Sequence, residues 1–298
     1  MTLFRAFLLV SLFSVGFLAC QNSAQESEQQ AESNAEASST EAVKIVSLSG
    51  FLTEVLFELG MGDQIVGVDI TSTYPEATKD IERMGHVSNI NAEAILKLQP
   101  DYIFLEETEQ APAAIQQLED AGIKVISVPT YYGMGNTLSA IETLDEYLDV
   151  DPAIVDKIAQ KIATDSTELV NMVAQSNKKP KVLFIYARGA GRVMASGQKT
   201  SMNAMIELAG GENVIQTFEG FQALTPEAIV QTPPEIIIMF TSGLASLDGI
   251  SGLAQVPGLA KTPAILNERV FTMDGHLMSS FGPRSGEAAQ TLAAEFMK

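Results

Sequence analysis

Apolar residues recur at helical spacing over one long stretch in the middle of the chain. Five aliphatic side chains form a single stripe over about seven turns of helix: Ile154, Ile158, Ile162, Leu169 and Val173. Asp151 can cap this helix through its side-chain oxygen, and Pro152 suits the first helical position. The pattern predicts one long helix from Asp151 to about residue 177.

Segments on the two sides of this helix resemble each other. Residues 93–104 contain Glu-Ala-Ile-Leu and then Pro-Asp-Tyr-Ile-Phe, whereas residues 227–238 contain Glu-Ala-Ile-Val and then Pro-Glu-Ile-Ile-Ile. Residues 59–66 and 208–215 form a second such pair, in the same order along the chain. A helix that leads into a buried strand is thus predicted twice, which indicates an internal repeat of one α/β unit.

This arrangement predicts an α/β protein with two Rossmann-like lobes, each a parallel-type sheet with flanking helices, joined by one long rigid interlobe helix. The predicted boundaries are residues 43–150 for the N-terminal lobe, 151–179 for the helix and 180–298 for the C-terminal lobe. Hydrophobic residues make up 46% of the chain, which is enough for each lobe to have its own core. Because a long helix resists bending, only a small closure on ligand binding is expected.

The first residues have the pattern of an export signal. Arg5 precedes an apolar run at residues 6–18, which is too short to span a membrane, and a small residue and Cys20 follow. Cys20 is the only cysteine, and its place is typical of a bacterial lipoprotein processing site. Residues 1–20 are interpreted as a signal peptide that ends at a lipidated Cys20, with cleavage without a lipid as the alternative. Residues 21–42 are expected to be a flexible acidic linker.

Charge and motifs disfavour several classes of function. A formal net charge of -19 argues against nucleic-acid binding, which depends on basic side chains. The sequence has neither a Gly-x-Ser-x-Gly elbow nor a His-Glu-x-x-His motif, and its two histidines are too few for a histidine-rich metal site. The protein is therefore not expected to be an enzyme. An unusual enzyme on this scaffold and an adhesive surface lipoprotein are the alternatives from other classes, and a test for turnover addresses the first.

Polar and aromatic side chains gather where the predicted strands end. In open parallel sheets a ligand binds beyond the carboxyl ends of the strands. These ends carry Tyr74, Tyr131, Tyr132, Tyr186, Arg188, Arg192 and His276. Two such edges, one from each lobe, are expected to enclose a single ligand pocket.

Four short stretches are distinctive: Thr-Ser-Thr-Tyr-Pro at residues 71–75, Arg-Gly-Ala-Gly at 188–191, Met-Ala-Ser-Gly at 194–197 and Phe-Gly-Pro-Arg at 281–284. With the two lobes and the export signal, they resemble the substrate-binding proteins of ABC importers for cobalamin, iron-siderophores and haem, and most of all the hemin-binding, HmuT-type members. The resemblance implies capture of haem b between the lobes and its delivery to an ABC permease dimer with a cytoplasmic ATPase. Binding of a ferric siderophore or cobalamin in the same place is the alternative.

The resemblance also implies that Tyr74 is the axial ligand of ferric haem. A phenolate is a hard anionic donor that suits Fe(III), and a nearby cation favours that charged form. Family members often have a basic residue two positions after this tyrosine, but Glu76 stands there in this chain. Lys79, Arg83 or an arginine of the second lobe would then have to supply the charge. Without the resemblance, Thr-Tyr-Pro indicates a surface turn with an ordinary exposed tyrosine.

Further haem contacts are implied in the same way. His86 and His276 are candidates for a sixth iron ligand, although a partly buried or surface histidine is the ordinary interpretation of each. Candidate contacts to the propionates or the porphyrin plane are Arg188, Arg192, Arg284, Phe51, Tyr131, Met194 and Phe281. The alternatives are surface salt bridges for the arginines and core packing for the others.

Glu93 and Glu227 occupy matching positions in the two repeats. Each opens a predicted helix, where the helix dipole favours a carboxylate, so capping is a sufficient local explanation. In relatives, one glutamate per lobe at these positions docks on arginines of the two permease subunits, and the resemblance implies this role for both. The protein is expected to be a monomer in the periplasm or on the outer face of the cell envelope, attached to the membrane only through a lipid on Cys20.

Overall fold

The computed structural model describes residues 42–107, 113–176 and 178–298, and Val43–Lys298 forms one compact unit. The predicted signal peptide, Cys20 and nearly all of the predicted linker lie outside the described residues. The unit contains four clusters of buried apolar side chains, two in each lobe, so it has its own cores and can be prepared without the preceding residues. In the described part of the chain, no helix combines the length and hydropathy that crossing a membrane requires.

The N-terminal lobe is built on a five-stranded parallel sheet with the strand order β3-β2-β1-β6-β7. Its strands are β1 (Ile45–Ser47), β2 (Ile65–Val68), β3 (Glu82–Arg83), β6 (Tyr102–Glu106) and β7 (Lys124–Val128). The flanking helices are α2 (Gly50–Glu58), α3 (Ala92–Leu98), α4 (Ala113–Asp120) and α5 (Asn136–Asp145). Two 3-10 helices, Gly62–Gln64 and Glu76–Asp80, and a short hairpin of β4 (Gly85–His86) and β5 (Asn89–Ile90) complete the lobe.

The C-terminal lobe contains a six-stranded sheet with the order β11-β9-β8-β12-β13, to which β10 adds by pairing with β8. The strands are β8 (Lys181–Ala187), β9 (Val193–Ser196), β10 (Glu212–Asn213), β11 (Phe221–Ala223), β12 (Ile236–Phe240) and β13 (Val270–Met273). The helices are α7 (Ser201–Leu208), α8 (Pro226–Gln231), α9 (Thr241–Ala245), α10 (Ile250–Leu253), α11 (Pro263–Leu266), α12 (Gly275–Ser279) and α13 (Ser285–Met297).

One edge of this second sheet departs from a purely parallel arrangement. β8 pairs in parallel with β12 and β10, but β9 runs antiparallel to β8, and β11 antiparallel to β9. The cause is a tight turn after β8, in which the Arg188 amide donates to the Arg192 carbonyl at 3.0 Å. A turn of this length joins neighbouring strands as a hairpin, whereas a parallel neighbour needs a long crossover.

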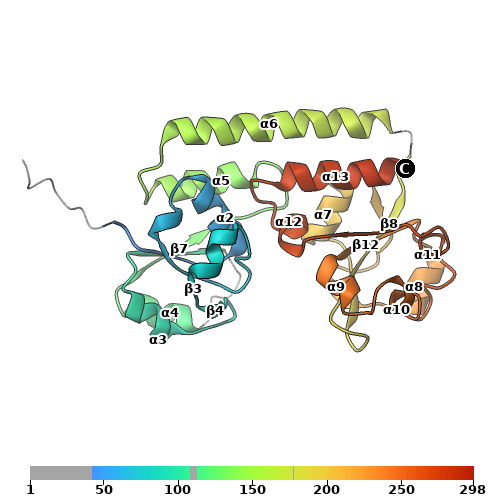
Figure 1. Cartoon of the computed structure of the whole chain (residues 1–298), viewed down its shortest axis with the longest axis horizontal. Coiled ribbons are helices and arrows are strands. Elements are labelled where there is room, and N and C mark those ends of the chain that lie inside the picture. The colour runs from blue at the N-terminus through green and yellow to red at the C-terminus, as the bar shows by residue number, and fades with distance from the viewer. Residues whose placement is uncertain (1–41, 108–112, 177) are drawn as a thin grey trace, which may run out of the picture. The chain divides into compact units, whose positions relative to one another are not determined.

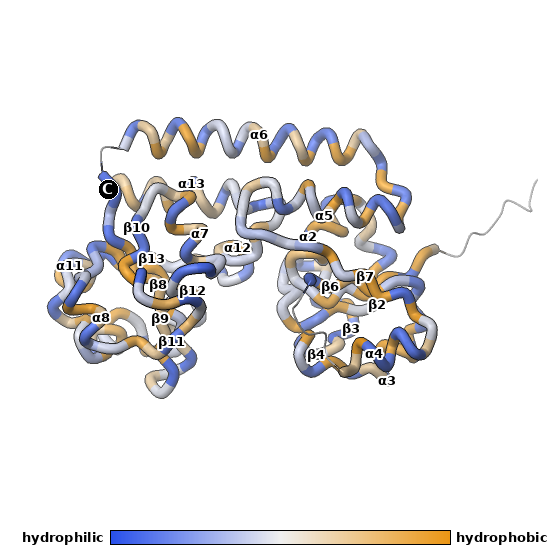
Figure 2. Tube along the Cα trace, turned by 180° about the vertical axis from the view of Figure 1, so that it is seen from behind, coloured by the Kyte–Doolittle hydropathy of each residue, from blue (hydrophilic) through white to orange (hydrophobic). Residues whose placement is uncertain are grey.

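The long helix is present as α6 (Pro152–Gln175), and Asp151 caps it as predicted, through its side-chain oxygen. Its apolar face serves both lobes: Ile158 and Ile162 belong to the core of the first lobe, and Leu169 to that of the second. α6 runs alongside α5 and α13, and apolar and polar positions alternate along it (Figures 1 and 2). One helix is therefore packed into two cores, which couples the lobes.

The predicted internal repeat has the same local structure in both lobes. The side chains of Asn91 and Thr225 cap α3 and α8, each by accepting an amide hydrogen bond three residues on. Gly60 and Gly210 follow α2 and α7 with φ angles of 78° and 83°, a left-handed conformation that glycine adopts without strain. The echoes in the sequence therefore mark equivalent turns and caps.

Candidate functional site

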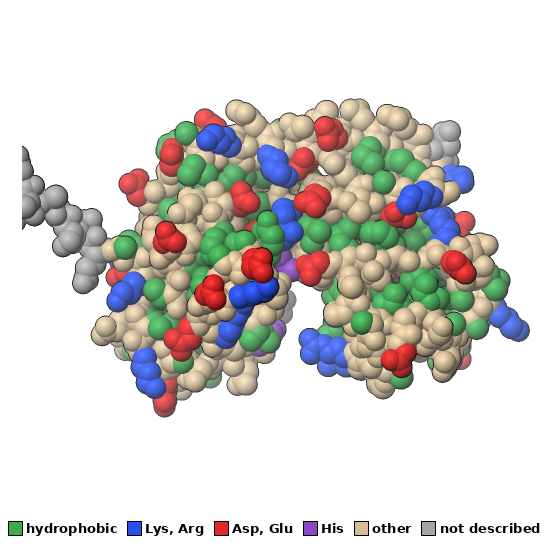
Figure 3. Space-filling model, viewed as in Figure 1, with side chains coloured by type: hydrophobic (Ala, Val, Ile, Leu, Met, Phe, Trp, Pro, Cys, Tyr) green, Lys and Arg blue, Asp and Glu red, His purple; other side chains and the backbone are tan. Residues whose placement is uncertain are grey.

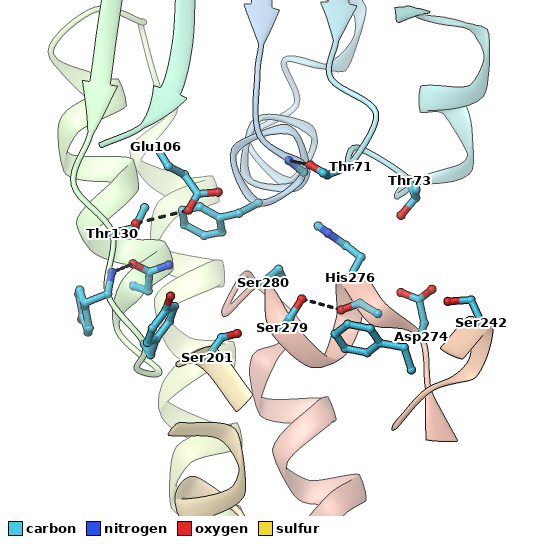
Figure 4. A pocket seen from close by; sticks show the side chains of 17 residues that line it. Thr71, Thr73, Glu106, Thr130, Ser201, Ser242, Asp274, His276, Ser279 and Ser280 are labelled. Atoms are coloured by element: carbon cyan, nitrogen blue, oxygen red, sulfur yellow. Dashed lines mark hydrogen bonds between the residues drawn. The ribbon is translucent and has the colours of Figure 1, made fainter. Parts of the chain in front are cut away.

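A cavity of about 460 Å³, called here the interlobe cavity, lies where strands of both sheets end. Figure 3 shows that the surface is hollowed between the lobes, and Figure 4 shows the side chains that line the cavity. Its labelled polar residues are Thr71, Thr73, Glu106, Thr130, Ser201, Ser242, Asp274, His276, Ser279 and Ser280. The cavity is where the rule for parallel sheets predicts a ligand pocket, and its lining is dominated by hydroxyl groups.

A second cavity of about 380 Å³, the aromatic cavity, is contiguous with the first because Ser201, Phe240 and Ser279 line both. Its other lining residues are Tyr186, Arg192, Met194, Met202 and Phe221. The rings of Tyr186, Phe221 and Phe240 lie edge to face, at centroid distances of 6.2–6.4 Å from the tyrosine. The second lobe therefore offers an aromatic surface beside a polar pocket, with one exposed arginine among its lining residues.

Tyr74 directly follows Thr73, which lines the interlobe cavity, but Tyr74 is not itself among the lining residues of either cavity. Its side chain is partly open to solvent, with 37% relative exposure for the residue. The guanidinium carbon of Arg284 lies 3.5 Å from the centre of the Tyr74 ring. Tyr74 belongs to the first lobe and Arg284 to the second, so this stacked pair joins the lobes at the candidate site.

The loop that carries Tyr74 is fixed by buried hydrogen bonds. The carboxylate of Asp69, which is 1% exposed, accepts from the amide of Ser72 at 3.1 Å and from its hydroxyl at 2.7 Å. Arg83 donates to the carbonyls of Asp69 and Ser72 at 2.9 and 2.7 Å, and to that of Thr78 at 3.1 Å. These bonds hold the loop in one conformation on either side of Tyr74.

A buried carboxylate links this stacked pair to the wall of the interlobe cavity. Glu54, on α2, accepts hydrogen bonds from Arg284 Nε at 2.8 Å and Nη2 at 3.0 Å, and its Oε2 lies 2.7 Å from His276 Nε2. Its side chain is 1% exposed. Burial alone would raise the pKa of Glu54, but the hydrogen bonds from His276 and Arg284, with their charges, outweigh burial and hold that pKa below its ordinary value. Glu54 is therefore a charged group at the lobe boundary.

The two histidines have different surroundings. His276 lines the interlobe cavity, but its Nε2 already contacts Glu54. His86 is exposed on β4, where its Nδ1 lies 2.7 Å from the Ser88 hydroxyl and accepts from the Ser88 amide at 3.2 Å. His86 is not among the residues that line either cavity. Only His276 is thus at the candidate site.

The other residues named from the sequence line one of the two cavities, lie exposed, or are buried in the core. Phe51 and Tyr131 line the interlobe cavity, and Arg192 and Met194 line the aromatic cavity. Arg188 is exposed, with its guanidinium 5.7 Å from the Tyr186 ring.

Phe281 belongs to the core instead of a cavity wall. It is 1% exposed, packs against Tyr132 at a centroid distance of 5.6 Å, and its carbonyl accepts from Asn136. The alternative of core packing therefore describes Phe281 in this structure.

Several residues of the site were missed in the sequence. Glu54 is the only charged residue in the run Phe-Leu-Thr-Glu-Val-Leu-Phe, and a lone carboxylate at a buried helix position is a signal of a charged partner. Phe221 and Phe240 were missed because an aromatic residue at the end of a strand looks the same in the sequence whether it faces a core or a cavity. Glu106 is the last residue of β6 and Asp274 follows β13, so both lie at the predicted strand ends, but neither was singled out among the residues there.

The chain resembles known proteins over most of its length. A family model described as periplasmic binding protein matches residues 45–277. An uncharacterised ABC transporter substrate-binding lipoprotein, YvrC of Bacillus subtilis (strain 168), is 29% identical over 85% of this chain and 79% of its own. The vitamin B12-binding protein of Vibrio parahaemolyticus is 27% identical over 85% and 89%. The apo form of the periplasmic heme-binding protein RhuT from Roseiflexus sp. RS-1 superposes with a TM-score of 0.81 at 31% identity, over 86% of this chain and 98% of that one.

Proposed function

The chain belongs to the periplasmic binding protein family, whose members bind substrates for ABC transporters and are not enzymes, and we propose that it captures ferric haem between its lobes and delivers it to an ABC permease. The observation that carries the choice of haem is Tyr74, a partly exposed phenol that directly follows the cavity-lining Thr73 and lies against the guanidinium of Arg284. A phenolate is a suitable axial ligand for Fe(III). We assign that role to Tyr74.

The aromatic cavity supports the same assignment. A porphyrin is a flat apolar ring with two carboxylates at one edge, and it is recognised by an apolar surface with a cation at its border. Tyr186, Phe221 and Phe240 provide aromatic rings, Met194 a polarizable side chain, and Arg192 the cation. We assign Arg192, at the end of the tight turn after β8, to a propionate, and Met194, on β9, to the porphyrin plane.

The hydroxyl-rich lining of the interlobe cavity favours a second candidate. Cobalamin carries many amide groups, which hydroxyl and carboxylate side chains can bind, and the Vibrio relative is named a vitamin B12-binding protein. Haem is preferred because Tyr74 offers a hard anionic donor that a corrin ligand does not need. The RhuT structure, which carries the name of a heme-binding protein, supports this preference.

A permease dimer is the proposed docking partner, and two exposed glutamates would contact it. Glu93 and Glu227 are exposed in the first turns of α3 and α8, which lie on the side of the unit away from α6 (Figure 1). We assign them to docking on basic residues of a permease dimer. Each glutamate is followed three positions later by an exposed aliphatic residue, Leu96 or Val230, which would add an apolar contact in each half. A lipid on Cys20 would keep the monomeric protein near that permease.

Spectroscopic titration tests the function. The Val43–Lys298 unit, wild type and Tyr74→Phe, is titrated with hemin while the Soret and charge-transfer bands are recorded. Saturable binding with a ferric-tyrosinate spectrum, lost in Tyr74→Phe, is expected. Phe51→Leu is the control: it alters an apolar side chain that lines the interlobe cavity, removes no hydroxyl group, and should keep the tyrosinate spectrum. Absence of saturable hemin binding by the wild type would reject the haem assignment.

A further inference from the structure

Glu76 stands where the resembling proteins often have a basic residue near the tyrosine, so another side chain must supply the positive charge beside Tyr74. The nearby basic side chains differ in what they contact. Lys79 is paired with Glu76 at 2.8 Å, and both side chains are largely exposed, at 67% and 87%. The guanidinium of Arg83 donates to three backbone carbonyls of the Tyr74 loop. The charges of Lys79 and Arg83 are thus directed to Glu76 and to the loop backbone, whereas the guanidinium carbon of Arg284 lies 3.5 Å from the centre of the Tyr74 ring.

The orientation of Arg284 is set from the opposite lobe. Its Nε and Nη2 both donate to the buried carboxylate of Glu54, and these two bonds hold the guanidinium carbon 3.5 Å from the centre of the phenol ring. Two donors committed to one carboxylate leave Arg284 poorly placed to bind a propionate bidentately. This geometry differs from the propionate role that the sequence suggested for Arg284.

We propose that Arg284, aimed by Glu54, is a positioning residue for Tyr74: it holds the phenol ring in place and stabilises the negative charge that Tyr74 brings to Fe(III). The inference rests on the proposed function and concerns the same site. As the bond between Fe(III) and Tyr74 Oη forms, the phenol O–H bond breaks and its proton passes to solvent, with no electron transferred. A cation over the ring face attracts the phenolate more strongly than the neutral phenol.

The arrangement also links the strength of the axial bond to the position of the lobes. Tyr74 and Glu54 belong to the first lobe, and Arg284 to the second, next to the start of α13. A movement that separates the lobes would take Arg284 away from Tyr74 and weaken the bond to iron. The same pair can therefore favour capture when the lobes are together and release when they are drawn apart.

The test compares two ligands that differ only in the metal. Hemin and metal-free protoporphyrin share the ring and the propionates, but only hemin can bond to Tyr74. In the Val43–Lys298 unit, Arg284→Gln should weaken hemin about tenfold, as expected for loss of a partly buried cation over an aromatic ring. Its affinity for protoporphyrin should change less than about twofold. The tyrosinate charge-transfer band should move to longer wavelength, because the phenolate donor orbital loses its stabilising cation.

Controls separate this role from folding and from the function itself. Arg284→Lys keeps the charge and should restore part of the hemin affinity. Lys157→Gln removes an exposed cation on α6 that lines neither cavity, and it should leave both affinities unchanged. If Arg284→Gln does not fold, Glu54→Gln with Arg284→Gln replaces the charged pair by a neutral hydrogen-bonding pair and should show the same selective loss for hemin.

Three outcomes would overturn the inference. An equal loss for both ligands would make Arg284 a propionate contact, and unchanged hemin affinity with an unshifted band would leave Arg284 with no role at Tyr74. In both cases the wild-type protein still binds hemin through Tyr74, so these outcomes reject only the role of Arg284 and leave the proposed function unaffected. Wild-type protein that binds no hemin would reject the proposed function and this inference together.

Discussion

The buried carboxylate of Glu54 leads to a quantitative prediction about stability. In Arg284→Met, Glu54 would keep only the contact from His276, so a charge that is 1% exposed would lose its bidentate partner. Removing one member of a buried ion pair costs about 3–5 kcal/mol. The Arg284 side chain is itself 18% exposed, which allows some water to reach the vacated space and places the expected loss near the lower end, about 3 kcal/mol.

This loss is large enough to measure by thermal unfolding of the Val43–Lys298 unit. In a unit of about 250 residues, each kcal/mol shifts Tm by about 2 °C, so Arg284→Met should lower Tm by roughly 6 °C. Arg188→Met is the matched control, because Arg188 is exposed and should shift the free energy of unfolding by no more than about 0.5 kcal/mol.

A double variant distinguishes a buried charge from simple loss of packing. Glu54→Leu with Arg284→Met removes both charges, and an apolar pair in place of a buried ion pair is often nearly neutral. The double variant should therefore be more stable than Arg284→Met alone. If the double variant is less stable by the sum of the two single losses, the two residues do not interact and the reasoning is refuted.

The remaining predictions concern pH, packing and docking. Because folding lowers the pKa of Glu54, its ionised form stabilises the protein above about pH 4.5, and this stabilisation is lost as the pH falls below that value. The Tm difference between wild type and Glu54→Gln should therefore shrink between pH 6 and pH 3. A Tm difference that stays constant over this range would contradict the prediction. Gly50→Ala should lower the free energy of unfolding by about 1–3 kcal/mol in chemical denaturation, because an added Cβ would lie 2.6 Å from the Thr71 carbonyl oxygen and 2.9 Å from His276 Nδ1. Unchanged stability would show that these neighbouring atoms can move to admit a methyl group. Glu227→Lys should abolish stimulation of the permease ATPase without changing hemin affinity, and stimulation equal to wild type would exclude Glu227 from docking.

Features that depend on local patterns were predictable from the sequence. The period of apolar residues and the Asp-Pro start gave α6 with its cap, because a helix of this length is determined by its own spacing and first turn. The repeated Glu-Ala-Ile motif gave the matching helices α3 and α8 for the same reason. The ends of the strands indicated the location of the interlobe cavity, since that rule follows from parallel sheet topology.

Features that depend on contacts between distant residues were not predictable. Glu54 and Arg284 are separated by 230 residues, so no local spacing reveals that they pair. The antiparallel edge of the second sheet arises from one tight turn, which a run of apolar residues cannot distinguish from a crossover. Phe281 begins the Phe-Gly-Pro-Arg stretch from which a haem contact was predicted, but its ring is buried beside Tyr132 and its carbonyl accepts a hydrogen bond from Asn136.

The central claim is that this site selects ferric haem, and a calorimetric comparison of hemin with cyanocobalamin on the same preparation of Val43–Lys298 tests it most directly. The arrangement of Tyr74, Arg284 and the aromatic cavity predicts saturable binding of hemin and at least about a hundredfold weaker binding of cyanocobalamin, since discrimination of this size corresponds to one strong bond. Saturable binding of cyanocobalamin with weak or no binding of hemin would contradict the account and assign the cavity to a corrin.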